Sequence, residues 1–188
     1  MQRLRKFLDE RTSSEEDYFV VYNLGVDGDN TENLLERLKL ETRHRLDENE
    51  EAAFIFEIGV NDSQFVHSQN SLRVPLEKFK NNIQSLINIA KRFSQKIIFA
   101  GLTPVDEPKT TPIPWNADKS YKNEYIQQYN DIIRTACEEN NLFFIEIFER
   151  LKILDYKNLF EDGLHPNSQG HQKIFEIIKE FLIKNKII

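Results

Sequence analysis

Four short apolar runs constrain the fold of this chain more than any other feature of its sequence. They are rich in β-branched and aromatic residues, and the first three stop at a glycine or at a Thr-Pro pair. Continuously apolar strands are typical of a parallel sheet that is covered on both faces. We therefore expect four buried parallel strands, at residues 18–24, 52–58, 96–102 and 142–147.

Longer amphipathic stretches separate these runs and predict helices. Asn30 or Thr31 is the expected N-cap of the first helix, and Pro75 suits the first turn of the second. Alternating strands and helices predict an α/β protein, a three-layer α/β/α sandwich with a parallel sheet. The expected helices span residues 31–46, 75–93, 118 or 120 to 140, and 168–184, and residues 103–116 form one long loop of the kind that is often functional.

The composition excludes several classes of protein. Lys and Arg number 25 against 31 Asp and Glu, and the formal charge of −6 argues against a nucleic-acid partner. Cys137 is the one cysteine, which excludes a disulfide framework and a cysteine-ligated metal site. No apolar run reaches the ~18 residues that a membrane helix needs, and no secretory signal is recognisable. We expect one domain over residues 1–188, in the cytoplasm, with no metal or cofactor.

Polar clusters follow the predicted strands. In an open parallel sheet, ligands bind beyond the carboxyl ends of the strands, so the site should be built from these loops. The clusters lie at residues 25–29, 59–62, 103–106 and, before the last helix, 162–167.

Asp162 and His165 form the most informative pair of side chains. They lie three residues apart in a turn that contains Gly163 and Pro166, so the two side chains can meet. A carboxylate in this position can hold one ring nitrogen and leave the other free as a general base. The alternative is an Asx-type turn beside a surface histidine.

Asn61 and Gly28 are candidate donors to a developing oxyanion. A side-chain amide at the end of a strand can donate to such an oxygen, and so can the backbone N–H of a glycine in a turn. The alternatives are ordinary turn residues, with a positive φ at the glycine.

Three blocks together resemble the SGNH, or GDSL-type, serine hydrolase family. Residues 59–62 (Gly-Val-Asn-Asp) resemble its Gly-x-Asn-Asp block, residues 162–165 its Asp-x-x-His block, and residues 26–31 its glycine block. The resemblance implies a flavodoxin-like fold and an oxyanion hole formed by Gly28 and Asn61. It also implies that His165 and Asp162 serve a serine nucleophile.

The chain departs from the family at the nucleophile. The family's serine lies in a Gly-Asp-Ser block after the first strand, and this sequence contains no such block. Residues 1–8 resemble the helix that follows that block, so we expect an N-terminally truncated domain. Ser13, Ser14 and Ser63 are poor substitutes, because the first two lie in an acidic loop and the third suits a cap.

A missing first strand predicts an unstable sheet. In the strand order 2-1-3-4-5 the first strand is interior, so its loss leaves a gap between residues 18–24 and 52–58. We expect the chain alone to be poorly stable or to associate at this gap.

The expected function is hydrolysis of a small-molecule ester or acyl substrate through an acyl-enzyme, with the nucleophilic serine absent from this sequence. Asp27, beside the oxyanion position, and Trp115, in the long loop, are the expected substrate-binding residues. The alternatives are a non-catalytic ligand-binding module on the same fold and a nucleotide or phosphate binder, against which the lack of a glycine-rich fingerprint argues. Acetylated sugars, lysophospholipids, aryl esters and thioesters remain open as substrates, as does the oligomeric state.

Overall fold

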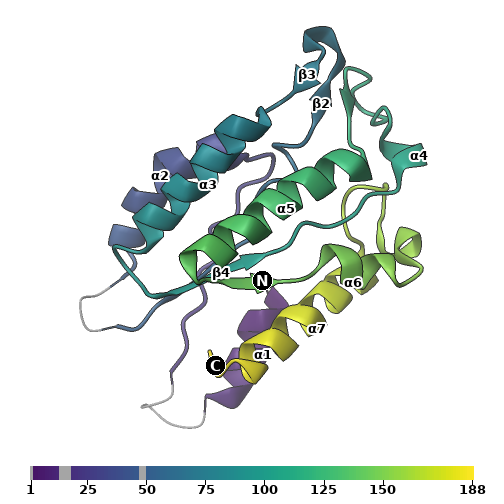
Figure 1. Cartoon of the computed structure of the whole chain (residues 1–188). Helices are drawn as coiled ribbons and strands as arrows, with labels where there is room; N and C mark the ends of the chain where they lie inside the picture. The colour runs from purple at the N-terminus through teal and green to yellow at the C-terminus, as the bar shows by residue number, and fades with distance from the viewer. Residues whose placement is uncertain (1, 13–17, 47–49) are drawn as a thin grey trace.

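A parallel sheet of three strands forms the centre of the protein, for which a computed structural model describes residues 2–12, 18–46 and 50–188 (Figure 1). Its order is β1 (Ala53–Phe56), β4 (Lys96–Ala100) and β6 (Phe143–Ile145). Ile97 pairs with Phe54, and Ile98 pairs with Phe143, both in parallel register. The strands predicted at residues 52–58, 96–102 and 142–147 are therefore confirmed. Their order in space is that of strands 3-4-5 of a flavodoxin-like sheet.

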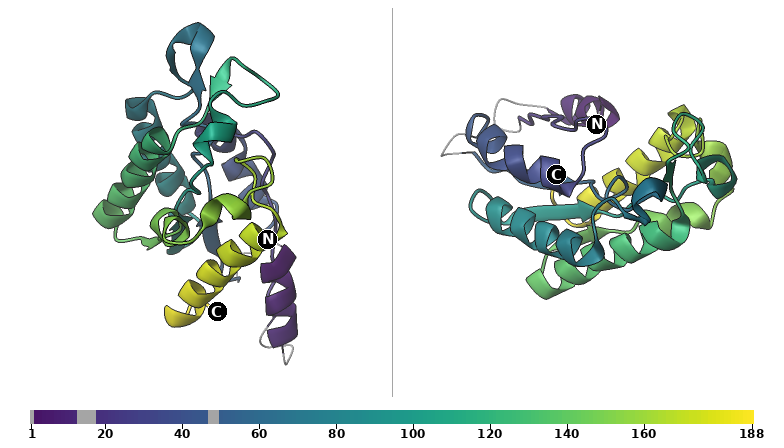
Figure 2. Two further views of the ribbon diagram at one scale, coloured as in Figure 1. Left: turned by 90° about the vertical axis from the view of Figure 1, so that its right-hand side faces the viewer. Right: turned by 90° about the horizontal axis from the view of Figure 1, so that it is seen from above.

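Helices cover both faces of this sheet, which confirms the three-layer α/β/α architecture. The bounds of the long helices are α1 Gln2–Arg11, α2 Thr31–Arg43, α3 Leu76–Ala90, α5 Asn123–Asn140 and α7 Ser168–Lys184. Alternate residues of β4 face opposite cores: Ile97 and Phe99 pack with α2, α3 and α5, whereas Ile98 and Ala100 pack with α1 and α7. Figures 1 and 2 show α1 and α7 side by side.

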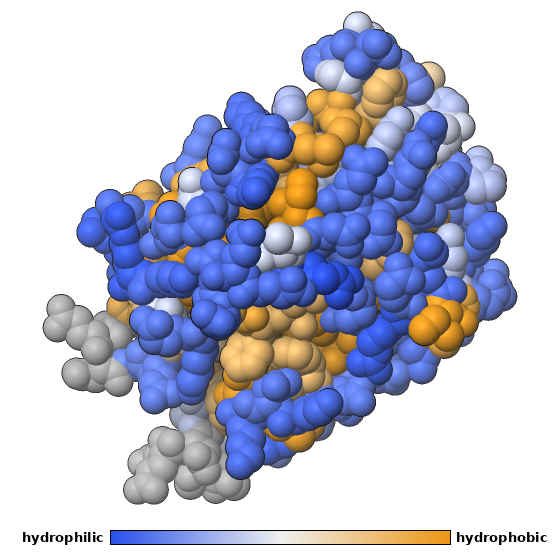
Figure 3. Space-filling view, viewed as in Figure 1, coloured by the Kyte–Doolittle hydropathy of each residue, from blue (hydrophilic) through white to orange (hydrophobic). Residues whose placement is uncertain are grey.

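Only the central strand is buried along nearly its whole length. The edge strands expose Ala53 and Phe143, so the prediction of burial on both faces is wrong for β1 and β6. The surface in Figure 3 is mostly hydrophilic, with separate apolar patches. Among the described helices, none is long and apolar enough to cross a membrane.

The ends of several predicted elements differ from the structure. Asn30 caps α2, whose last residue, Arg43, lies three residues before the predicted end. Pro75 is the N-cap of α3 and lies outside its first turn. The predicted long loop contains a one-turn helix, α4 (Glu107–Thr110), because Pro108 suits a first helical turn. The remaining short helices are η1 His67–Gln69, α6 Phe148–Lys152 and η2 Tyr156–Leu159.

A second, antiparallel sheet was not predicted. It consists of β3 (Ser71–Leu72), β2 (Phe65–Val66) and β5 (Lys119–Ser120), in that order. Two-residue strands are too short to show an alternating pattern in the sequence. Because β5 occupies residues 119–120, α5 begins at Asn123 and later than predicted. The β2–β3 hairpin projects at the top of Figure 1.

The prediction of a strand at residues 18–24 is wrong for the described chain. The segment forms no β-ladder, and β1 pairs only with β4 among the described residues. Two arginine side chains bind its carbonyl groups instead: Arg5 donates to Val21 O at 2.8 Å and Arg37 to Leu24 O at 2.7 Å. A strand requires a neighbouring backbone, and no described backbone lies in register beside this segment.

Candidate active site

The turn between η2 and α7 brings Asp162 and His165 into contact. Asp162 Oδ2 lies 2.7 Å from His165 Nδ1, and its Oδ1 accepts hydrogen bonds from Leu164 N at 2.9 Å and His165 N at 2.8 Å. The same carboxylate thus closes the turn and orients the imidazole. His165 Nε2 has no hydrogen-bond partner among the described residues, which leaves it available as a base.

The geometry of this turn depends on Gly163. Its φ of +90° is in the left-handed region, and a Cβ there would lie 2.7 Å from Lys109 Cβ. Partial burial raises the pKa of Asp162, but the hydrogen bonds from His165 and Leu164 outweigh it and hold the pKa below its ordinary value. The carboxylate therefore stays ionised and acceptor-only at neutral pH.

Asn61 and Gly28 lie on neighbouring loops. Asn61 Nδ2 donates to Asp29 O at 2.9 Å, which joins the loop after β1 to the loop before α2. Gly28 has a φ of +76°, and its backbone N–H has no acceptor in the described part of the chain. Each residue therefore has an N–H available to a ligand, because the amide of Asn61 carries a second hydrogen.

A cavity of about 230 Å³ gathers the predicted residues. Gly28, Asn61 and His165 line it, and Asp162 lies behind His165. Asp27 and Trp115, the expected substrate-binding residues, also line it. The lining residues are Asp27, Gly28, Asn61, Gln64, Arg73, Ile113, Trp115, Asn116, Lys119, Tyr121, Leu164 and His165.

The loop that carries Asn61 is anchored by the buried residue Asp62. Its carboxylate accepts hydrogen bonds from Thr31 N, at 3.1 Å, and from the Thr31 hydroxyl, at the first turn of α2. Burial raises the pKa of Asp62 above its ordinary value, although the Thr31 bonds oppose this. Asn82 from α3 also donates to Thr31 Oγ1, at 2.9 Å. These bonds give Asp62 a structural role in fixing the two loops together.

Four lining residues lie outside every loop that the sequence pointed to: Gln64, Arg73, Lys119 and Tyr121. The second sheet brings them to the site, because Phe65 of β2 pairs with Ser120 of β5. Lys119 and Arg73 form no ion pair with any described carboxylate, and Arg73 donates to Gly28 O at 3.1 Å. No spacing in the sequence marks these residues, since the strands that carry them are only two residues long.

No serine lines this cavity in the described chain. Ser63 is fully buried, and its Oγ donates to Val60 O at 2.7 Å, which fits the capping role. Ser13 and Ser14 lie outside the described residues.

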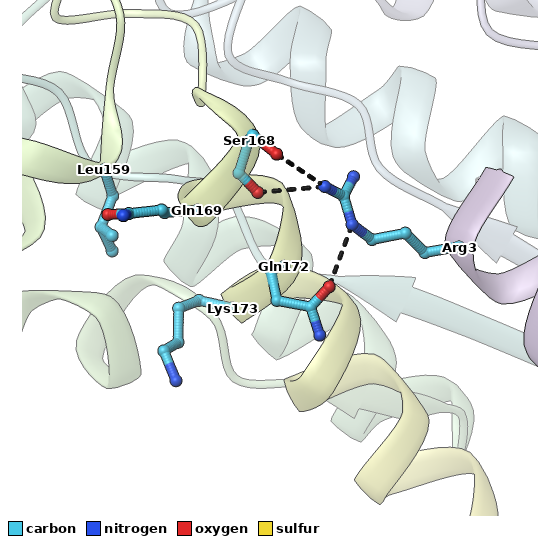
Figure 4. A pocket seen from close by; sticks show the side chains of 6 residues that line it. All are labelled: Arg3, Leu159, Ser168, Gln169, Gln172 and Lys173. Atoms are coloured by element: carbon cyan, nitrogen blue, oxygen red, sulfur yellow. Dashed lines mark hydrogen bonds between the residues drawn. The ribbon is translucent and has the colours of Figure 1, made fainter.

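A larger cavity, of about 380 Å³, lies between α1 and the start of α7. In Figure 4, Arg3 reaches across it and donates to Gln172 Oε1 at 3.0 Å and to Ser168 Oγ at 3.0 Å. None of the predicted site residues lines it. Because Arg3 of α1 binds Gln172 and Ser168 of α7 there, we interpret it as a junction between the two helices. No cluster of three or more His, Cys, Asp or Glu side chains suited to a metal ion occurs within residues 2–12, 18–46 and 50–188.

The sequence matches a known family and curated relatives. Residues 2–173 match the model of the GDSL-like Lipase/Acylhydrolase family. An isoamyl acetate-hydrolyzing esterase of Saccharomyces cerevisiae is 26% identical over 139 residues, which are 66% of this chain and 55% of that protein. A GDSL esterase/lipase of Arabidopsis thaliana is 27% identical over 129 residues, or 66% of this chain and 40% of that protein. The chain thus spans about half the length of these relatives or less.

Solved structures share the fold. LAE5, an alpha/beta hydrolase enzyme from the metagenome of Lake Arreo in Spain, superposes with a TM-score of 0.69 at 19% identity. The match covers 97% of this chain and 78% of LAE5. At this identity the likeness concerns the fold alone.

Proposed function

Since the chain belongs to the GDSL-like lipase/acylhydrolase family, we propose that it provides the histidine, the aspartate and the oxyanion-binding groups of a serine ester hydrolase. The observation that carries the proposal is the contact between Asp162 Oδ2 and His165 Nδ1, which lie 2.7 Å apart. His165 lines the same cavity as Gly28 and Asn61. This set combines an oriented base with two N–H donors, which is what acyl transfer requires. The substrate is a small-molecule ester or acyl compound.

In the proposed mechanism His165 Nε2 takes the proton of a serine hydroxyl while the serine oxygen attacks the ester carbonyl. The N–H groups of Gly28 and Asn61 hold the oxyanion of the tetrahedral intermediate. His165 then returns the proton to the leaving alcohol, and an acyl-serine forms. Water, activated by the same imidazole, releases the acid. Asp162 stays ionised and stabilises the imidazolium in each step.

We propose that a Gly-Asp-Ser strand beside β1 supplies the serine of this mechanism, because the printed sequence contains no Gly-Asp-Ser block. Two observations support this position. The outer edge of β1 has no ladder partner in the described chain, and residues 18–24 belong to no described strand and expose Tyr18, Val20 and Tyr22. A strand inserted there would satisfy backbone groups on both sides. A cytoplasmic location remains a prediction from the single cysteine.

A ligand-binding module without turnover is the second candidate. The absence of a serine from the described cavity favours it. Such a module would be stabilised by esters of suitable size and would leave them intact.

The test begins with the codons that precede Met1 in the source DNA, translated in frame. An apolar strand ending in Gly-Asp-Ser supports the proposal, and the protein with that strand should hydrolyse p-nitrophenyl acetate. His165→Ala should abolish this hydrolysis. Ser63→Ala is the matched control and should retain it, because the Ser63 hydroxyl is bound to Val60 O.

The chain as printed should show little hydrolysis. Retained turnover in His165→Ala would exclude the proposed mechanism. A stop codon with no such strand, together with ester binding in a thermal-shift assay and no hydrolysis, would favour the binding module.

A further inference from the structure

The amide of Asn61 has two conceivable orientations, with oxygen and nitrogen exchanged, and its contact with a backbone carbonyl identifies the one present. Asp29 O lies 2.9 Å from one end of the amide. A carbonyl can only accept a hydrogen bond, so that end must be Nδ2. Asn61 Oδ1 therefore faces the other way, toward Tyr121.

The directions of the next two hydrogen bonds follow from the first. Tyr121 Oη lies 2.9 Å from Asn61 Oδ1, which can only accept, so the single phenol hydrogen is donated to it. Gln64 lies 2.6 Å from the same Oη and must then donate through Nε2. Burial raises the pKa of Tyr121 to about 12, so the phenol keeps this hydrogen at neutral pH.

This arrangement leaves the side-chain oxygen of Gln64 buried without a hydrogen-bond partner in the described chain. The residue is only 3% exposed, and its Oε1 has no hydrogen-bond partner within the described ranges. An unpaired buried acceptor is destabilising and is rare without a compensating role. The donation from Nε2 to Tyr121 is the one contact that explains this orientation of the Gln64 side chain.

We infer that Tyr121 and Gln64 are positioning residues that fix the amide of Asn61 with its nitrogen toward the cavity. The pairing of β2 with β5, at Phe65 and Ser120, holds Tyr121 against Gln64. One hydrogen of Asn61 Nδ2 is used by Asp29 O, and the second remains for a ligand. The consequence for catalysis rests on the proposed function, in which that hydrogen binds the oxyanion.

Loss of this orientation should affect the transition state more than substrate binding. A rotated amide would present Oδ1 to the oxyanion and repel it. Tyr121→Phe should therefore lower kcat by roughly tenfold to a hundredfold with little change in KM, since a single oxyanion donor contributes about a hundredfold or more.

The first measurement uses the chain itself and needs no turnover. In ¹⁵N-labelled protein, the two Nδ2 hydrogens of Asn61, assigned by their absence in Asn61→Ala, should be distinct and slow to exchange with water. In Tyr121→Phe their exchange should be at least about tenfold faster, because the amide has lost the bond to Oδ1. Tyr125→Phe is the matched control on α5, and it should leave them unchanged.

The second measurement tests the direction of the bonds. In Gln64→Glu an ionised carboxylate accepts the phenol hydrogen and deprives Asn61 Oδ1 of it, whereas the protonated carboxyl can donate to Oη and restore the chain of bonds. The kcat of Gln64→Glu relative to wild type should rise as the pH falls, and that of Gln64→Leu should stay flat. The charged groups that line the same cavity, Asp27, Arg73, Lys119 and His165, are unchanged in both variants.

Unchanged Asn61 resonances in Tyr121→Phe would overturn the inference, as would equal pH profiles for the two Gln64 variants. If the protein that carries the Gly-Asp-Ser strand hydrolyses no ester, the proposed function fails. The exchange measurement then decides the positioning role by itself.

Discussion

The indole of Trp115 stacks on the imidazole of His165, with ring centroids 5.9 Å apart and an interplanar angle of 28°. Trp115 comes from the loop after α4 and is 54% exposed, so it lies over the cavity with one face in solvent. The stack restrains the same ring that Asp162 orients through Nδ1. It also places an apolar surface at the cavity.

Trp115→Ala should release the His165 ring. The stack should contribute about 0.5–1.5 kcal/mol, so kcat/KM of the ester-hydrolysing form should fall by up to about tenfold. The free energy of unfolding should change by less than about 0.5 kcal/mol because the indole is exposed. Proton NMR of His165 provides the direct measurement: loss of the indole ring current should move its ring resonances, whereas Trp115→Phe should move them less. Resonances that stay in place would contradict the stack.

The Asp162 carboxylate should make stability depend on pH. Its folded pKa is lowered, so the stabilisation is complete above the ordinary value of 3.8 and is lost as the pH falls through the lowered value. Asp162→Asn should cost about 1–2 kcal/mol at pH 7, and the difference from wild type should shrink below pH 3.8. Urea unfolding at several pH values measures this. Asp131→Asn on α5 is the control, with a change below about 0.5 kcal/mol. A difference that is constant down to pH 2 would refute the prediction.

Gly163→Ala should destabilise the protein by about 1–3 kcal/mol, because φ is +90° and the new Cβ would lie 2.7 Å from Lys109 Cβ. Gly25→Ala is the comparison: the nearest atom to its Cβ would be Asn23 Oδ1 at 3.4 Å, and its φ is not in the left-handed region. Urea unfolding of both variants gives the two values. Equal costs would show that the turn does not require glycine.

The edge of β1 that has no ladder partner in the described chain should make the protein associate. Light scattering and thermal melts over a range of protein concentrations should reveal this. Ala53→Lys should reduce the association, since Ala53 is exposed at the start of β1 and a lysine blocks pairing between edges. A monomeric chain with a cooperative melt at high temperature would show that the edge is protected.

The sequence was sufficient where a feature depends on neighbouring residues. The carboxylate of Asp162 and the ring of His165 meet because only two residues, one of them a glycine, separate them, and Asn30 caps α2 through hydrogen bonds with Glu32 and Asn33. The central strand at residues 96–100 and the helices that cover it follow from the hydrophobic pattern. These features need only the local chain and a general tendency to bury apolar side chains.

Only the tertiary structure decided the rest. Residues 18–24 have the composition of a strand, yet the carbonyls of Val21 and Leu24 bind arginine side chains, because no backbone among the described residues lies in register beside them. Tyr121 and Gln64 are 57 residues apart, and Tyr121 reaches both Gln64 and Asn61 through a sheet whose strands are too short to leave a pattern in the sequence. A hydrogen bond between distant residues is specified by where the whole chain places its backbone, which local composition does not encode.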